Sequence, residues 1–185
     1  MNSATGQRTL GASAIASLRR AIAWTAAHAG EFGADPARLT LSGSSAGAHL
    51  QAMALAHDWP AEGLPADLIK GAVPITGIYD PEPARHVSVN AEIGLTAEIA
   101  RRNDALTLPP RVRCPVALFV GGAEPPLWQR QTTLSAAHLR RHGLAPTLEV
   151  VPGANHFSIL DQYLDPASPI VRAILAIAHG KERAA

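Results

Sequence analysis

The chain has 185 residues, of which 47% are hydrophobic, 17% charged and 4% aromatic. This length and composition indicate one globular domain over residues 1–185 and carry no signature of disorder. The net charge of +1, from 16 basic and 15 acidic residues, argues against a nucleic-acid partner.

The sequence also bears on membrane contact and on disulfide formation. No run of residues is apolar enough and long enough to span a bilayer, and the first residues do not form a secretory leader. The single cysteine, Cys114, cannot form an internal disulfide, and we expect it to be a buried thiol just before a strand. We therefore expect a cytoplasmic protein without membrane contact.

Hydrophobic periodicity predicts helices that alternate with strands along the whole chain. The predicted helices cover residues 12–29, 46–57, 96–102 and 126–142, with a last one from Ser168-Pro169 to Ile177. The predicted strands cover residues 38–42, 71–76, 115–120 and 146–151. Such alternation is typical of a parallel α/β sheet with helices on both faces.

Local features refine these elements. In the first helix Ile15, Leu18 and Ile22 share one face, and Trp24 is expected near it. Pro74 predicts an irregularity in the second strand, because proline cannot donate a ladder hydrogen bond. The continuous apolar run at 115–120 is typical of a strand that is buried on both faces.

The most informative motif is G-x-S-x-G from Gly43 to Gly47, between the first predicted strand and the second predicted helix. In that context it is a nucleophile elbow, which exposes the hydroxyl of Ser45 on a strained turn. The two glycines are expected to permit a close strand-to-helix approach that a Cβ atom would block. The structural alternative is a small serine in a glycine-rich turn.

A serine nucleophile needs a base, and in a parallel sheet that base should follow a later strand. His156 lies in the loop after the fourth predicted strand and is the preferred base. His49, four residues after Ser45, is interpreted as a packed residue that supports the elbow. The remaining histidines are interpreted as surface or core-edge residues: His28, His57, His86, His138, His142 and His179.

The base in turn needs a carboxylate to orient it. Glu124 follows the third predicted strand and is the preferred acid, while Asp80, after the second strand, is the alternative. Asp80 also reads as a turn or capping residue in Asp80-Pro81. With Glu124 the chain order is serine, acid, histidine, which is the order of the α/β-hydrolase arrangement.

These residues resemble the α/β-hydrolase superfamily, and within it the kynurenine formamidase (arylformamidase) and esterase group. The similarity runs from about residue 12 to residue 175 and is carried by four stretches. They are Ser42 to Leu50 at the elbow, Gly77 to Pro83, Glu124 to Gln131, and Asn155-His156-Phe157. The resemblance implies the C-terminal portion of an α/β-hydrolase fold, with about four parallel strands flanked by helices.

The chain departs from this family in two respects. Glu124 stands where the acid is usually Asp, and no His-Gly-Gly segment precedes Ser45. In the family that segment helps to form the oxyanion hole, so the N–H of Ala46 is the donor expected to remain. The absence of the family's N-terminal strands would leave strand 38–42 as an exposed edge, which favours self-association.

The sequence therefore predicts a serine hydrolase that cleaves a small carboxylic ester or aryl formamide. Ser45 attacks, His156 moves the proton, Glu124 orients His156, and Ala46 N–H holds the oxyanion. No metal-ligand cluster or phosphate-binding glycine loop is apparent, so neither a metal nor a cofactor is expected. The alternative is a truncated, catalytically impaired remnant or fragment that acts at most as a binding scaffold.

Overall fold

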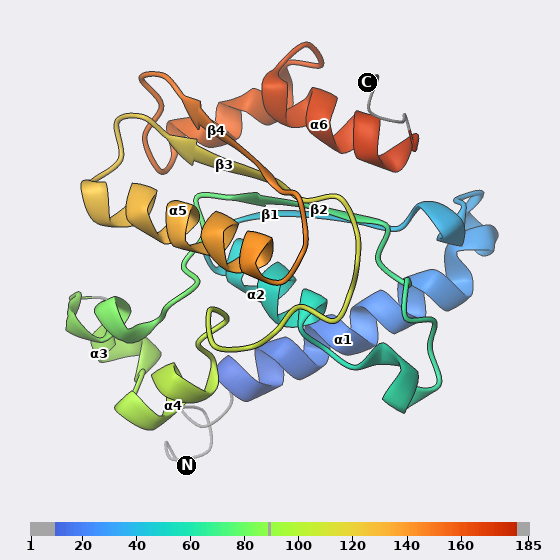
Figure 1. Ribbon diagram of the computed structural model, residues 1–185, viewed down its shortest axis with the longest axis horizontal. Coiled ribbons are helices and arrows are strands. Elements are labelled where there is room, and N and C mark those ends of the chain that lie inside the picture. Colours follow the sequence, from blue (N-terminus) through green and yellow to red (C-terminus); the bar gives the residue numbers. More distant parts are fainter. Residues whose placement is uncertain (1–9, 89, 181–185) are drawn as a thin grey trace.

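The computed structural model describes residues 10–88 and 90–180 of the chain (Figure 1). Its centre is a sheet of four parallel strands in the order β1-β2-β3-β4. The strands are β1 (Thr40–Ser44), β2 (Gly71–Ile75), β3 (Ala117–Gly121) and β4 (Thr147–Val151). The expected parallel α/β sheet and the α/β-hydrolase fold are confirmed.

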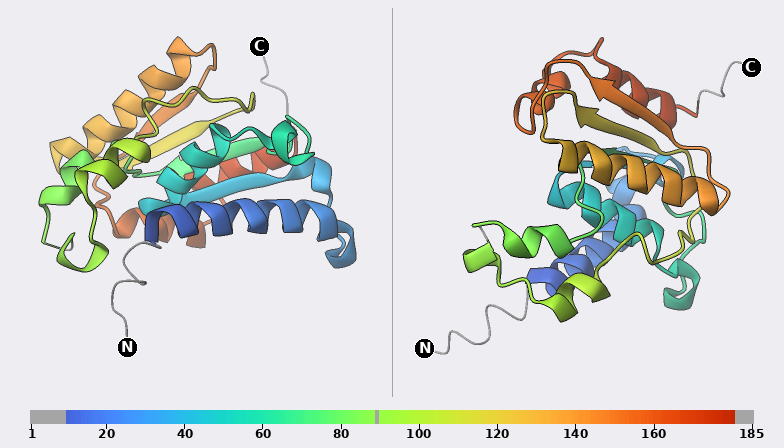
Figure 2. Two further views of the ribbon diagram at one scale, coloured as in Figure 1. Left: turned by 90° about the horizontal axis from the view of Figure 1, so that it is seen from below. Right: turned by 60° about the vertical axis from the view of Figure 1, so that its left-hand side comes forward.

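Helices cover both faces of this sheet (Figures 1 and 2). The α-helices are α1 (Leu10–His28), α2 (Ala46–Leu55), α3 (Asn90–Ile93), α4 (Ala97–Arg102), α5 (Pro126–Arg141) and α6 (Pro169–Ala178). Short 3₁₀ helices span Ala29–Phe32, Pro36–Arg38, Trp59–Glu62, Glu82–His86 and Ser158–Leu164. Helix α6 lies on one face, α2 and α5 lie on the other, and α1 packs outside α2.

The alternation of side chains along each strand explains these two layers. Val73 and Ile75 of β2 belong to the apolar cluster beneath α6, which also contains Ile170. Ala72, the residue before Val73, points to the opposite face and belongs to the cluster on the α2 and α5 side, together with Leu139. Every residue of β2 and β3 is buried, as expected for strands covered on both faces.

Pro74 produces the irregularity that the sequence predicts. The N–H groups of Ala72 and Thr76 donate towards β3, to Pro115 O at 3.1 Å and Phe119 O at 2.7 Å. Pro74 lies between them and has no N–H to donate. The ladder between β2 and β3 is accordingly reduced to the pair Ile75 and Phe119, with an isolated bridge nearby.

Two local predictions differ from the structure. The first strand begins at Thr40 and not at residue 38, because Pro36–Arg38 form a 3₁₀ turn capped by Asp35, whose side chain accepts from Ala37 N–H. Trp24 does not share the buried face of α1: it is 52% exposed and stacks on His28. The remaining predicted helices and strands are present, with ends shifted by a few residues.

Strand β1 lies at the edge of the sheet. Within the described residues it pairs with β2 alone, through the register Thr40 to Gly71 and onward to Ser44 and Ile75. Its residues are partly exposed, in contrast to those of β2. Separately, none of the helices described here is long and apolar enough to cross a membrane.

Candidate active site

All the predicted site residues lie at one edge of the sheet. Ser45 follows β1, Glu124 follows β3 and His156 follows β4, each within a few residues of the strand end. Because the strands are parallel, their carboxyl ends meet at this edge, which is where α/β sheets bind ligands. Thr76, directly after β2, joins them there, although the sequence analysis did not select it.

Ser45 occupies the strained elbow that the motif predicts. Its backbone angles are φ 56° and ψ −116°, a region that costs a non-glycine residue about 1–3 kcal/mol. Ser45 N–H donates to Ile75 O at 3.0 Å, and Ser45 O accepts from the N–H groups of Ala48 and His49. Its side chain makes no capping hydrogen bond with α2, so the hydroxyl is not committed to the helix.

The two motif glycines play different roles. A Cβ on Gly43 would lie 3.1 Å from Gln51 Nε2 and 3.3 Å from the carbonyl carbon of Gly47. The predicted close approach of strand and helix is therefore correct at Gly43. At Gly47 the prediction is wrong, since a Cβ there would meet nothing within 4 Å.

Ala46 is the first residue of α2, so its N–H has no acceptor inside the helix. The same helix end carries the positive pole of the helix dipole, which favours negative charge next to Ser45. The position expected for an oxyanion donor is thus at a helix N-terminus.

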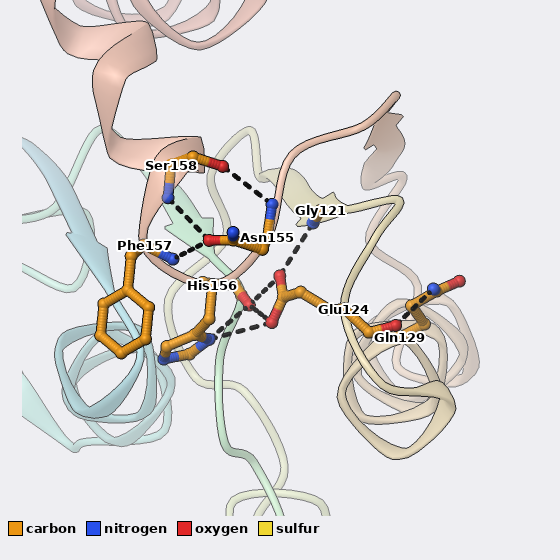
Figure 3. A network of polar contacts seen from close by, with 8 residues as sticks. Gly121, Glu124, Gln129, Asn155, His156, Phe157 and Ser158 are labelled. Carbon is orange, nitrogen blue, oxygen red and sulfur yellow. Dashed lines mark hydrogen bonds and ion pairs between the residues drawn. The ribbon is translucent and has the colours of Figure 1, made fainter.

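Glu124 is a buried carboxylate surrounded by donors (Figure 3). Its side chain is 0% exposed, and Oε1 accepts from Gly121 N–H at 2.9 Å. The Thr76 hydroxyl lies 2.5 Å from each carboxylate oxygen. Oε2 accepts from Nδ1 of His156 at 2.9 Å, which joins the two strand ends.

A turn built on Asn155 holds His156 in place. Asn155 Oδ1 accepts from the N–H groups of Phe157 and Ser158, and Ser158 Oγ accepts from Asn155 N–H (Figure 3). The imidazole side chain is 22% exposed and packs beside Trp128, with ring centroids 4.3 Å apart. Phe157 stands edge-on to the same ring at 5.6 Å.

The structure brings Glu124, and not Asp80, to His156. Asp80 Oδ1 accepts from Glu82 N–H at 2.9 Å, which is the turn role that the sequence allowed for. The backbone of Asp80 is bound by Gln131, which accepts from its N–H and donates to its carbonyl. No hydrogen bond or ion pair joins Asp80 to His156.

His49 is packed behind the elbow. Its Nε2 donates to Asn103 O at 2.7 Å, while its backbone N–H binds Ser45 O. Burial lowers the pKa of His49 below its ordinary value of 6.5, so the neutral ring is favoured. Cys114 is half-buried before β3, and burial raises the pKa of its thiol to about 12.

Thr76 is the residue that sequence reasoning missed. It is fully buried and has φ 44°, which is a strained value for a β-branched side chain. Its hydroxyl also lies 3.1 Å from Nδ1 of His156. The available signal was a small polar residue at the carboxyl end of a buried strand, directly before Gly77.

The backbone of Ser45 is connected to the Glu124–His156 pair through the end of β2. Its N–H binds Ile75 O, and the next residue, Thr76, contacts both Glu124 and His156. The backbone of Ser45 and the side chains of Glu124 and His156 therefore all lie around the end of β2. Within residues 10–88 and 90–180, no group of three or more His, Cys, Asp or Glu side chains is arranged to hold a metal ion.

The fold and this edge of the sheet define an α/β-hydrolase architecture, and comparison with protein families agrees. A family model described as alpha/beta hydrolase fold matches residues 12–160. The chain belongs to the α/β-hydrolase fold family.

Sequence comparison with individual proteins shows which members of this family the chain resembles. The chain is 37% identical over 133 residues to kynurenine formamidase from Salmo salar, covering 69% of this chain and 45% of that protein. It is 32% identical over 142 residues to kynurenine formamidase from Danio rerio, covering 74% and 48% respectively. The resemblance to the formamidase group is confirmed, and the chain spans just under half the length of these relatives.

Solved structures show the same fold at lower identity. The acetyl ester-xyloside bifunctional hydrolase from Caldicellulosiruptor lactoaceticus has a TM-score of 0.64 and 17% identity, covering 87% of this chain and 64% of that one. At this identity the likeness establishes the fold alone.

Proposed function

We propose that the chain carries the active site of a serine hydrolase that cleaves a small carboxylic ester or an aryl formamide. The observation that supports this most directly is the Glu124–His156 hydrogen bond beside a serine in the strained elbow conformation. The proposed roles are Ser45 as nucleophile, His156 as base, Glu124 as the orienting acid and Ala46 N–H as oxyanion donor.

The geometry supports the following steps. Glu124 accepts from Nδ1–H of His156, which leaves Nε2 free to take the Ser45 proton. Ser45 Oγ then bonds to the carbonyl carbon, and the negative charge that develops on oxygen lies at the α2 N-terminus near Ala46 N–H. The His156 imidazolium returns its proton to the leaving alcohol or amine, and water releases the acyl group by the reverse sequence.

The surroundings of His156 favour a substrate with an aromatic part. Trp128 packs beside the imidazole, and Phe157 is 80% exposed next to it. Both rings can contact a flat apolar leaving group as the proton is transferred. The relatives named kynurenine formamidase support the same class of substrate.

Covalent labelling tests the proposal without knowledge of the substrate. A fluorophosphonate probe should modify Ser45 and no other serine, as read by mass spectrometry of the intact protein and its peptides. Ser45→Ala should abolish labelling, whereas the matched variant Ser44→Ala should retain it. Labelling that survives Ser45→Ala would reject the assignment of the nucleophile.

The second candidate is an impaired site in a chain that acts at most as a binding scaffold. Its motivation is that Ala46 N–H is the single oxyanion donor proposed above, and a site with one donor fewer typically turns over about 10²–10³ more slowly. This candidate would be favoured by a folded chain that the probe never labels but that still binds one non-hydrolysable aryl amide per chain.

We also propose that the chain self-associates through β1. The strand presents one edge without a partner among the described residues, and such edges readily pair with another chain. Sedimentation velocity over about a hundredfold range of concentration should show larger species. Ser42→Lys, exposed on β1, should reduce them, while Thr107→Lys, exposed away from the sheet, should not.

A further inference from the structure

Three donors surround the Glu124 carboxylate, and one of them, the Thr76 hydroxyl, is a side chain with no role in the mechanism above. Gly121 N–H and Nδ1–H of His156 each bind one oxygen, at 2.9 Å. The Thr76 hydroxyl lies 2.5 Å from both oxygens. Since the carboxylate is fully buried, this hydroxyl replaces water as its remaining hydrogen-bond partner.

The hydroxyl of Thr76 also faces His156, at 3.1 Å from Nδ1. A hydroxyl carries one proton, and it donates that proton preferentially to the charged carboxylate. Its lone pairs are then left towards Nδ1, where they can accept a hydrogen bond. Nδ1 therefore faces acceptors on both Glu124 and Thr76.

This arrangement discriminates between the two neutral forms of His156. With the proton on Nδ1, the N–H points at Glu124 Oε2 and at the Thr76 oxygen. With the proton on Nε2, the Nδ1 lone pair would oppose the lone pairs of both partners. The alternative would require Thr76 to turn its proton away from a buried carboxylate, which is costly.

The backbone fixes Thr76 in this position. Thr76 N–H donates to Phe119 O at 2.7 Å, and the residue is held at φ 44° with 0% exposure. A β-branched residue rarely adopts this conformation, and it persists only where the surroundings determine it. The strained turn directs the hydroxyl at Glu124 and His156, and not into the apolar layers of the sheet.

We propose that Thr76 is a positioning residue for His156. Its hydroxyl holds the Glu124 carboxylate and selects the Nδ1–H form of the imidazole, so that Nε2 is free to accept the Ser45 proton. The inference rests on the proposed hydrolase function for its catalytic meaning. The tautomer itself is a property of the free chain and is measured without any substrate.

Nitrogen-15 NMR of the histidine rings provides the test, at about pH 8.5, where an ordinary histidine is neutral. The His156 signals are assigned by their loss in His156→Gln. In the wild type the proton should reside on Nδ1. Thr76→Ala should raise the population of the Nε2–H form about tenfold, and the isosteric Thr76→Val should do the same. Thr76→Ser retains the hydroxyl and should restore the wild-type tautomer.

The rate of fluorophosphonate labelling at Ser45 should follow the tautomer. It should fall about tenfold in Thr76→Ala and stay within about twofold of wild type in Thr76→Ser. A wild-type His156 with its proton on Nε2 overturns the proposal even if the hydroxyl-free variants do not fold. An unchanged tautomer in folded Thr76→Ala overturns it as well. A tautomer shift in a chain that is never labelled supports the role of Thr76 and rejects the hydrolase proposal alone.

Discussion

Ser45 and Thr76 are the two non-glycine residues with positive φ among residues 10–88 and 90–180, and they sit at the ends of neighbouring strands. The hydrogen bond from Ser45 N–H to Ile75 O ties the two turns together. Ser45 is partly exposed, and its hydroxyl makes no cap to α2. Thr76 is fully buried, and its hydroxyl contacts Glu124 and His156.

The comparison shows one kind of backbone strain used for two purposes. At Ser45 the strained residue is partly exposed at the carboxyl end of β1, and its hydroxyl is not bound to the helix that follows. At Thr76 the strain directs a hydroxyl inward, where it satisfies a buried charge. The first is the expected conformation of a nucleophile, and the second supports the residues that would activate it.

The largest effect on reaction rate is expected for substitution of Glu124, the carboxylate that the Thr76 hydroxyl contacts. Glu124→Gln removes the charge that stabilises the His156 imidazolium, and should lower the rate of Ser45 labelling and ester hydrolysis by about 10²–10⁴. Asp80→Asn, the matched change at the turn carboxylate, should stay within about twofold. Rates are measured with the fluorophosphonate probe and a p-nitrophenyl ester.

The opposite result for these two variants would mean that Asp80, and not Glu124, is the acid partner of His156. If Asp80→Asn abolished reaction while Glu124→Gln retained it, the observed Glu124–His156 contact would not be the working one. Circular dichroism of both variants guards against simple loss of fold.

The second prediction places glycine at each strained position. Ser45→Gly relieves the strain and loses few contacts, so the free energy of unfolding should rise by about 1 kcal/mol after the entropic cost of glycine. Thr76→Gly relieves the same kind of strain but leaves a buried carboxylate short of a donor. We expect it to lower the free energy of unfolding by about 2–4 kcal/mol.

Urea unfolding monitored by fluorescence measures both changes, with Ser44→Gly as a control at an unstrained neighbour. Equal shifts for Ser45→Gly and Thr76→Gly would show that the two turns do not differ in the way proposed.

The same contrast explains how far the sequence could predict the molecule. The elbow at Ser45 has a sequence signal, because Gly43 clears space beside α2 and the apolar periods before and after it define strand and helix. Glu124 follows the continuously apolar strand β3 and His156 follows the next predicted strand, β4, and the parallel fold brings both to one edge. The fold class and the contact between Glu124 and His156 were therefore predictable.

Thr76 had only the weak signal of a small polar residue at a strand end. Its role depends on the register of β2 against β3 and on contacts with side chains from the loops after β3 and β4. The start of β1 was misplaced because a proline turn and a strand start compete for the same residues near Arg38. Trp24 was misassigned because helical periodicity indicates which side of a helix is buried but not how many residues that buried side includes. The Trp24 ring instead stacks on His28 at the surface.

The third prediction is a smaller effect on stability, and it distinguishes the two glycines that flank Ser45 in the motif. Gly43→Ala would press a Cβ against the Gly47 backbone at 3.3 Å and should lower the free energy of unfolding by about 1 kcal/mol. Gly47→Ala meets open space within α2 and should raise it by up to about 1 kcal/mol, because alanine favours helix. Thermal unfolding of the two variants is sufficient, and equal destabilisation would contradict the assigned contact.

The smallest effect concerns His49, which supports Ser45 from behind as Thr76 supports His156. Its folded-state pKa lies below the ordinary value of 6.5 because burial disfavours the charged ring. Below about pH 6.5 the unfolded chain therefore binds more protons than the folded chain, and the free energy of unfolding falls as the pH is lowered. Burial lowers the pKa of His138 as well, so both residues contribute in the same direction.

The two contributions separate by substitution. His49→Gln retains an N–H donor for Asn103 O but does not titrate, so it should flatten the decline in unfolding free energy between about pH 7.5 and pH 5.5. His138→Gln, whose ring binds Leu108 O, should flatten the decline in the same direction. Urea unfolding across this range measures both slopes. A steeper decline in His49→Gln would mean that the charged ring is stabilised in the fold, and His49 would then belong to the reactive side of the elbow and not to its support.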